Sequence, residues 1–427
     1  MIEAVERLVK LLESENVEWE VFYQFGRSGS FRIERETLER SQRKFYSGIG
    51  LRVGLKGRLG FSYITGLHPG EEELKKLVER AVKLAKISEV PFRGFPAGER
   101  VNRVKGIYDR AIDEIPFEEA HRLALEYAEL MREKKGEETL SGSLSLAVGT
   151  SGVVNSNGIE LEERSTYMGV SAYAVLSEPP GTGSYRQSFT SLQPVEELER
   201  AVEKAIDEAR LSARARKLEP YSGELVLEPN ALASIMEVFL SNLYGDEVYH
   251  GRSRFSKPGE VIGDFSLVDD STLPELPGSY SFDGEGTPGQ RTLLVEDGTV
   301  RNFLLDHTYA SFLGMESTGN ALRTFRSVPY IGTSNLILEP GEESLEDYEG
   351  VIVRKVFGEH TANPVSGDFS LTVELGYVVE NGELKPFKDN MLVGNVFELL
   401  RTLKPGRKAE RISSFVSPRG LVEGRLV

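Results

Sequence analysis

The sequence predicts an α+β protein of two domains, each combining helices with a mainly antiparallel sheet, and the second more β-rich. Its 427 residues, 39% hydrophobic and 28% charged, are typical of a folded protein with more than one core. Helical and strand patterns are grouped rather than alternating one by one, which favours α+β over a parallel α/β sheet. The stretch KLEPYSG at residues 217–223 breaks a long helical pattern. We therefore place the domains at residues 1–217 and 218–427.

The first half is expected to contain four helices and several antiparallel strands. Apolar residues at helical spacing predict helices over residues 2–14, 71–88, 116–135 and 195–213. Alternating patterns predict strands over residues 17–25, 144–148 and 168–175, and a hairpin over residues 48–65. The glycine- and serine-rich residues 26–30 are expected to form a turn.

Strands dominate the expected structure of the second half. Apolar and alternating segments predict strands over residues 224–227, 291–295, 300–305, 335–338, 351–357 and 369–379. Asp297-Gly298 and Asn381-Gly382 are typical of two-residue hairpin turns, whose central positions favour positive φ. Helical spacing predicts helices over residues 231–243 and about 393–403, and the basic residues 404–411 are expected to form a solvated loop.

Composition restricts the chemistry and the compartment. The chain has no cysteine, which excludes disulfides, a thiolate nucleophile and a cysteine-ligated metal. No apolar run approaches the roughly 18 residues of a membrane span, and the N-terminal pattern is unlike a secretory signal, so we expect a cytoplasmic protein. A net charge of −16 argues against general nucleic-acid binding. Only five glutamines among many charged residues indicate a thermophilic source.

A glycine-rich segment at residues 281–321 carries the most specific pattern. It contains Asp283-Gly284-Glu285-Gly286, then the Asp297-Gly298 turn, then GMESTGNA at residues 314–321. This order of motifs resembles the C-terminal half of the TldD/PmbA family. Shorter matches, such as GLRV at residues 50–53 and NSNG at residues 155–158, extend the resemblance over nearly the whole chain. The resemblance implies a link to intracellular proteolysis and to modulation of DNA gyrase.

The catalytic branch of that family carries an H-E-x-x-x-H motif on a helix and a cysteine near the C-terminus. Two imidazoles and a thiolate hold Zn²⁺ with one position open, and the glutamate accepts a proton from the bound water. The resemblance places the two histidine positions on Met236 and Ser241, and the glutamate position on Glu237. Both imidazoles and the thiolate are therefore missing. Apolar spacing favours Met236 in the core and Glu237 in solvent, and a remaining role for Glu237 stays open.

Weaker candidates for a site are the histidines and the acidic pairs. No two of the five histidines have helical ligand spacing, and a composite metal site would combine His307 with Asp306 or Asp283. The histidines are His68, His121, His250, His307 and His360. Asp269 with Asp270, or Asp283 with Glu285, offers paired carboxylates for acid–base chemistry, although surface charge is the simpler interpretation.

A GxGxxG pattern at residues 284–289 is not a dinucleotide loop by our interpretation. It contains Pro288 and leads into an expected strand, whereas a dinucleotide loop opens a helix. We expect instead a shaped loop at a domain or subunit surface, with a possible role in peptide binding. The candidate residues are Asp283, Glu285, Gly286, Thr318, Gly319 and Asn320.

The resemblance, taken with the lost ligands, implies a PmbA/TldE-like subunit without its own activity. It implies a heterodimer with a TldD-like metalloprotease chain that holds the zinc, no cofactor in this chain, and an extended peptide as substrate. A homodimer could form when the chain is alone. Two alternatives remain open: a self-sufficient metal-independent hydrolase centred on Asp283 and Glu285, and a binding protein that acts on gyrase or a toxin–antitoxin system.

Overall fold

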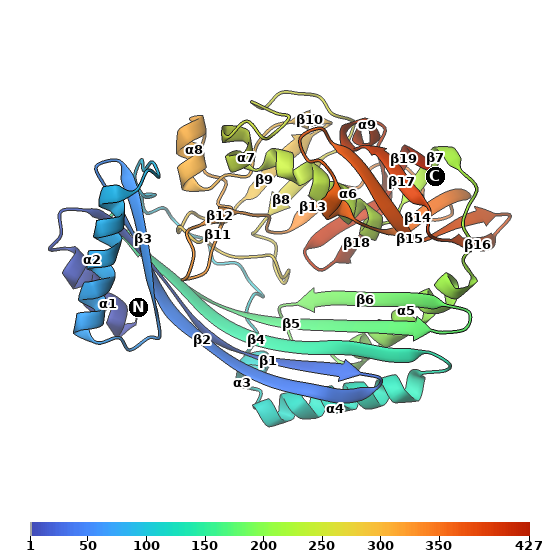
Figure 1. Ribbon diagram of the computed structural model, residues 1–427, viewed down its shortest axis with the longest axis horizontal. Coiled ribbons are helices and arrows are strands. Elements are labelled where there is room, and N and C mark those ends of the chain that lie inside the picture. Colours follow the sequence, from blue (N-terminus) through green and yellow to red (C-terminus); the bar gives the residue numbers. More distant parts are fainter. Residues whose placement is uncertain (1) are drawn as a thin grey trace.

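The computed structural model describes residues 2–427 and confirms an α+β protein. Figure 1 shows the long, curved sheet of the first half lying beneath a more compact second half. Helices α4 and α5 lie on the far side of this sheet from the second half, and α1 and α2 lie at its other end. Between residues 2 and 427, no helix is both long and apolar enough to cross a membrane.

Six antiparallel strands form the first sheet, in the order β3-β2-β1-β4-β5-β6. They are β1 (Glu18–Glu34), β2 (Thr37–Leu55), β3 (Arg58–Thr65), β4 (Thr139–Asn155), β5 (Glu160–Leu176) and β6 (Gly181–Phe189). The expected turn at residues 26–30 is wrong, because β1 runs through these residues and pairs with β2 and β4. Only glycine fits at position 26, because a Cβ there would lie 2.4 Å from the Tyr46 hydroxyl.

Two groups of helices cover the outer face of this sheet. Helices α1 (Glu3–Leu12) and α2 (Glu71–Ile87) cover one end, and α4 (Phe117–Lys134) and α5 (Val195–Arg214) cover the other. The short α3 (Arg110–Glu114) contacts β4 and β5. Side chains alternate along a strand, so Val21 and Phe31 of β1 pack under helices. Glu20 and Phe22 therefore point to the opposite face, toward the second half.

The second half is built on an eleven-stranded sheet. Its strands are β7 (Tyr221–Leu227), β8 (Leu267–Asp270), β9 (Arg291–Glu296), β10 (Thr299–Val300), β13 (Leu336–Leu338), β14 (Gly350–Phe357), β15 (Asp368–Glu380), β16 (Glu383–Phe387), β17 (Met391–Asn395), β18 (Lys404–Ile412) and β19 (Phe415–Leu426). Strand β19 pairs with both β17 and β7, so the path β19-β17-β15-β14-β7 closes on itself. Only the β13–β19 and β14–β7 pairs are parallel, which confirms a mainly antiparallel sheet.

The remaining elements of the second half are short, apart from one buried helix. They are α6 (Pro229–Leu240), η1 (Ser241–Leu243), α7 (Gly245–Tyr249), α8 (His307–Leu313), η2 (Glu359–Thr361), α9 (Val396–Arg401) and the pair β11 (Ala321–Leu322) and β12 (Tyr330–Ile331). Helix α6 packs against β14 and β19, and its apolar side chains belong to the core of this half. The Asp297-Gly298 and Asn381-Gly382 turns join β9 to β10 and β15 to β16, as predicted.

Three expectations for the second half are wrong in detail. The expected strand at residues 300–305 ends at Val300, because the N–H groups of Arg301 and Asn302 both point to the Leu294 carbonyl, and Leu304 then bonds to Leu243 instead of β9. The expected helix at residues 393–403 is divided between β17 and α9. Residues 404–411 are not a loop but most of β18, because they pair with β19. In these segments, pairing with distant parts of the chain therefore sets the secondary structure and outweighs the local sequence pattern.

The two halves meet through a small apolar cluster around the glycine-rich loop. Phe22 and Val153 of the first sheet pack with Phe282 and Phe325 of the second half. Gly286, with φ +85°, lies so close to this sheet that a Cβ would be 3.0 Å from Val153. The loop at residues 281–289 is therefore held against the inner face of the first sheet.

Candidate functional site

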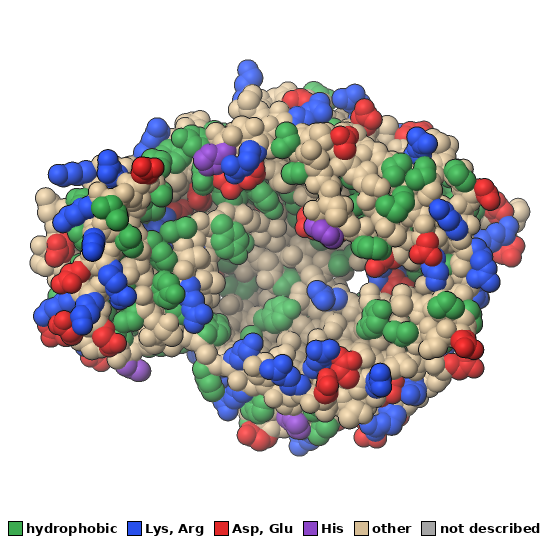
Figure 2. All heavy atoms as spheres, viewed as in Figure 1, with side chains coloured by type: hydrophobic (Ala, Val, Ile, Leu, Met, Phe, Trp, Pro, Cys, Tyr) green, Lys and Arg blue, Asp and Glu red, His purple; other side chains and the backbone are tan. Residues whose placement is uncertain are grey.

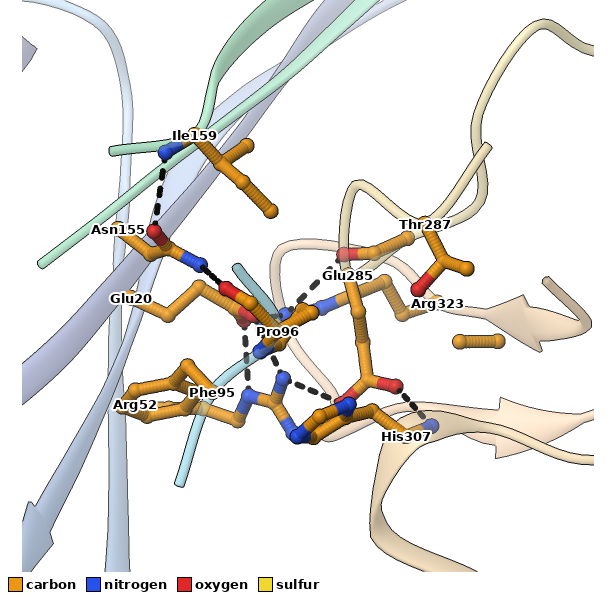
Figure 3. A network of polar contacts seen from close by, with 12 residues as sticks. Glu20, Arg52, Phe95, Pro96, Asn155, Ile159, Glu285, Thr287, His307 and Arg323 are labelled. Atoms are coloured by element: carbon orange, nitrogen blue, oxygen red, sulfur yellow. Dashed lines mark hydrogen bonds and ion pairs between the residues drawn. The ribbon is translucent and has the colours of Figure 1, made fainter. Parts of the chain in front are cut away.

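A buried cluster of charges lies at the contact between the halves (Figure 3). Arg52 of β2 donates two hydrogen bonds, of 2.8 and 2.7 Å, to the carboxylate of Glu20, its cross-strand partner on β1. The same guanidinium donates a 2.7 Å bond to Glu285 from the glycine-rich loop. Arg323 of the second half donates to Glu20 as well. All four side chains are at most 3% exposed, so the cluster joins the halves away from water.

The chain near Asp283 is shaped around that carboxylate. Asp283 accepts hydrogen bonds from the backbone N–H groups of Glu285 at 2.9 Å, Thr287 at 3.0 Å and Ala321 at 3.0 Å. The loop and the 314–321 turn are thus held together by one side chain that is 3% exposed. Burial raises the pKa of Asp283, the adjacent Glu285 raises it further, and the three N–H donors oppose this shift.

Glu285 differs from Asp283 because it is paired with a cation. Burial by itself raises the pKa of Glu285, but Arg52 and the backbone N–H of His307 outweigh that effect and lower it. Arg323 is completely buried, and this burial lowers its pKa to about 10 despite the nearby Glu20. Its Nε and Nη2 atoms have no hydrogen-bond partner within residues 2–427. The cluster is therefore ionic, compact and closed to substrate.

Asp306 and His307 extend the cluster at the start of α8. The Asp306 carboxylate caps this helix by accepting a 2.7 Å bond from the N–H of Tyr309. Burial, followed by the charge of Glu285, raises the pKa of Asp306 to about 7. His307 contributes its backbone N–H, at 2.8 Å from Glu285 Oε2. No group of three His, Asp or Glu side chains in the described part of the chain is arranged to hold a metal ion.

A second polar network holds the 314–321 turn. Asn320 donates a 2.8 Å bond to Asp269, which also accepts from Ser334. Burial raises the pKa of Asp269 to about 6. The Thr318 hydroxyl accepts a 2.6 Å bond from the N–H of Leu305, and Gly319 follows with φ +67°.

These positions correct the expectation of a surface loop. Asp283, Glu285 and Asn320 are buried because each satisfies several backbone or side-chain donors inside the protein. Gly286 and Gly319 are buried too, and Thr318 is half-buried. The alternative of an acid–base pair formed by Asp283 and Glu285 is also not supported, since neither carboxylate faces solvent. The loop does lie at a domain surface, namely the contact between the two halves.

The helix at the family's zinc-motif position is α6. Met236 is fully buried and packs in the core of the second half, whereas Glu237 is exposed. Ser241 lies past the end of α6, in η1, and its hydroxyl donates a 2.8 Å bond to the carbonyl of Val238. Burial raises the pKa of Glu237, and the charge of Glu359 adds to this shift. A thioether in a packed core and a hydroxyl turned to its own backbone do not fit a zinc site.

Sequence reasoning missed three members of the charge cluster: Glu20, Arg52 and Arg323. They come from three distant segments, and no spacing rule connects them. A signal does exist for Arg52, because it is the single charge among the apolar and glycine residues 48–55 of β2, whereas Glu20 follows Glu18 on the same strand and does not stand out. An opposite charge on the neighbouring strand is the usual solution for such a position.

Comparison with known proteins shows which protein family the chain resembles in sequence. Three sequence models match it: PmbA/TldA metallopeptidase domain 1 over residues 19–85, the central domain over 110–213 and the C-terminal domain over 221–427. They divide the first half in two, and our two-domain division stays a prediction. An uncharacterized protein from Methanocaldococcus jannaschii is 31% identical over 99% of both chains.

A metalloprotease of the same organism is 26% identical, over 93% of this chain and 90% of its own. The crystal structure of TldE from Thermococcus kodakarensis has a similar fold, with a TM-score of 0.87, 22% identity and 99% of both chains covered. The matched models cover most of the sequence, in the order of the family's domains. The chain therefore belongs to the PmbA/TldD metallopeptidase family.

Proposed function

We propose that this chain is a non-catalytic subunit that pairs with a TldD-like metallopeptidase chain and helps to bind extended peptide substrates. In this arrangement the TldD-like chain holds the zinc and carries out hydrolysis. This chain needs no cofactor of its own. The fold that it shares with TldE is compatible with such a role.

The observation that carries this proposal is that the histidine positions of the zinc motif, on and just after α6, hold no zinc-binding side chains. The two positions where the catalytic branch has histidines are Met236, in the core, and Ser241, bonded to its own backbone. The chain also lacks the cysteine that would complete the ligand set. Glu237 alone keeps the family's residue type, and without a metal-bound water it has no proton to accept.

The buried charge cluster supports the same conclusion. The acidic pair that could serve a metal-independent hydrolase has structural partners: Glu285 joins the halves through Arg52, and Asp283 holds its own loop to Ala321. A hydrolytic carboxylate must reach its substrate within hydrogen-bond distance. Both of these are at most 3% exposed.

The experiment that tests the proposal compares this chain, a TldD-like chain and their mixture. Zinc is measured by elemental analysis, complex formation by size-exclusion chromatography with light scattering, and hydrolysis with fluorescein-labelled unfolded casein. We expect stoichiometric zinc only in the TldD-like chain, a complex of both chains, and hydrolysis that is fastest in the mixture.

Two matched variants sharpen the result. Glu237→Ala in this chain is expected to leave hydrolysis by the mixture unchanged, whereas Glu→Gln in the H-E-x-x-x-H motif of the TldD-like chain is expected to abolish it. Hydrolysis by this chain alone that is lost in Glu237→Ala would overturn the proposal. Absence of any complex between the chains would also overturn it.

A further inference from the structure

A cavity of about 460 Å³ lies between the two halves, on the side of β6 that pairs with no strand. Its walls come from β6 and α5 of the first half, and from the start of α6, β14 and β18 of the second half. This volume lies within the range of small-ligand and peptide side-chain pockets. Figure 2 shows that the molecule is hollowed between its halves, with Lys and Arg side chains on the lower rim of the hollow.

The cavity is basic although the chain as a whole is acidic. Three carboxylates, Glu208, Glu228 and Glu410, lie in its walls. The cations in its walls are Arg186, Arg200, Lys204, Arg354, Lys355 and Arg411. The lining therefore has an excess of three positive charges, in a protein whose net charge is −16.

Two of the three carboxylates are already neutralised by neighbours. Glu208 accepts 2.5 Å and 2.7 Å bonds from Lys355 and from the N–H of Ser184. Glu228 accepts a 2.8 Å bond from Arg419, which comes from outside the cavity wall, and a bond from Tyr377. Arg354 also lies 3.3 Å from Glu208 and 3.7 Å from Glu228, so these carboxylates balance Lys355 and Arg354 but none of the other cations of the wall.

Three cations in the wall have no carboxylate partner. Among residues 2–427, neither Arg186 nor Lys204 forms an ion pair or a side-chain hydrogen bond. Arg411 donates only to carbonyl oxygens, of Ser188 at 2.9 Å and Ser413 at 3.1 Å. Burial lowers the pKa of Arg411, as expected for a cation without a paired anion. An anion in the cavity would supply the missing partner.

The edge of β6 adds a backbone contact. Ser184 points its N–H and carbonyl away from β5, since they bond to Glu208 and Lys355, and the carbonyl of Ser188 bonds to Arg411. Strand alternation gives Arg186, midway between them, the same orientation. The N–H and carbonyl of Arg186 thus lie on the free edge of β6, between Ser184 and Ser188, whose edge-facing groups are already hydrogen-bonded. This edge can therefore accept a peptide backbone at one residue, but not a full added strand.

We propose that this cavity binds an acidic segment of an extended peptide, with its carboxylates on Arg186, Lys204 and Arg411 and its backbone on the edge of β6. Guanidinium groups match carboxylates in geometry and charge. A peptide backbone can donate to the Arg186 carbonyl and accept from its N–H on the free edge of β6, whereas a nucleic-acid phosphodiester has acceptors only. This inference deepens the proposed function, and it rests on that function only for the bound peptide's role as a protease substrate.

The test is fluorescence anisotropy with two rhodamine-labelled peptides, a Glu- and Gly-rich 10-residue peptide and its Gln-substituted counterpart. We expect the acidic peptide to bind at least about tenfold more tightly to this chain, with affinity that falls as salt increases. Equal binding of both peptides overturns the proposal. Competition distinguishes the sources of negative charge: stronger displacement by inorganic phosphate or single-stranded DNA than by a free acidic peptide also overturns it.

Paired variants locate the site. Arg186→Gln with Lys204→Gln is expected to weaken the acidic peptide about tenfold, because neither side chain has another partner in the fold. The matched control is Arg40→Gln with Lys44→Gln, two exposed cations of β2 that do not line the cavity. Equal weakening by both pairs would mean general surface charge and would refute a defined site.

The outcome is separable from that of the proposed function because no TldD-like chain is present in this binding assay. Selective binding that depends on Arg186 and Lys204 supports the site even if the mixture of chains proves inactive. Hydrolysis by the mixture that is unaffected by these variants, together with unselective binding, refutes the site and leaves the subunit role intact.

Discussion

Arg52 should be the residue on which the joining of the two halves depends most. It makes three charge-assisted hydrogen bonds of 2.7–2.8 Å to two buried carboxylates. Arg52→Met keeps much of the side-chain length but leaves Glu20 with Arg323 only, and Glu285 with a backbone N–H only. Breaking a buried ion pair in this way costs about 3–5 kcal/mol. We expect a loss of that size in the free energy of unfolding.

The control restores charge balance without restoring the bonds. Arg52→Met combined with Glu285→Gln leaves one buried pair, Glu20 with Arg323, and no uncompensated charge. We expect the double variant to recover at least about half of the loss, roughly 2 kcal/mol, because most of the single variant's cost is an unpaired buried carboxylate.

Urea unfolding followed by tryptophan fluorescence measures these differences. The only tryptophan, Trp19, is buried and adjacent to Glu20, so it reports on this part of β1. Far-ultraviolet circular dichroism follows both halves at once. A loss under about 1 kcal/mol for Arg52→Met, or a double variant less stable than the single one, would refute the reasoning.

Three further predictions concern other parts of the fold. The pKa of Asp306 is raised to about 7, so this carboxyl ionises first in the unfolded chain, and its contribution to the free energy of unfolding falls as pH rises from about 4 to about 7. Asp306→Asn keeps the helix cap, and its unfolding free energy relative to wild type should rise by up to about 4 kcal/mol over that range; parallel pH profiles would contradict this. Met236→Ala should cost about 2–5 kcal/mol in chemical unfolding, and Glu237→Ala within about 0.5 kcal/mol; similar costs would place Met236 outside the core. Gly60→Ala should cost about 1–3 kcal/mol, because a Cβ would lie 2.2 Å from the Ala81 carbonyl of α2; Gly394→Ala, with ordinary contacts only, is its control in thermal unfolding, and equal effects would argue against the close approach.

The helices of the first half were predictable because their apolar spacing matches the faces that they bury. Leu74, Leu77 and Ala81 of α2 are all fully buried, as their period indicates. The long strands were not, because small and polar residues such as those at 26–30 have low strand propensity. Their pairing is fixed by two neighbouring strands rather than by local pattern, and sequence spacing carries little of that information.

The candidate site was predictable only in part. The loss of both histidines could be read directly from Met236 and Ser241. The role of Glu285 could not, since it depends on Arg52, more than 200 residues earlier in the chain. The role of Asp283 depends on how its own loop and Ala321 fold around the carboxylate, which no spacing rule gives. The suggested link to gyrase and the cytoplasmic and thermophilic expectations stay predictions.

The position of β19 has a consequence for synthesis. It pairs with β7, β13, β17 and β18, and it follows all four in the chain. On the ribosome, the first sheet has every strand available once residue 189 has emerged, whereas the closed strand path has to wait for residues 415–426. Nascent chains should therefore acquire protease resistance in two stages, with the second half remaining sensitive until β19 leaves the exit tunnel.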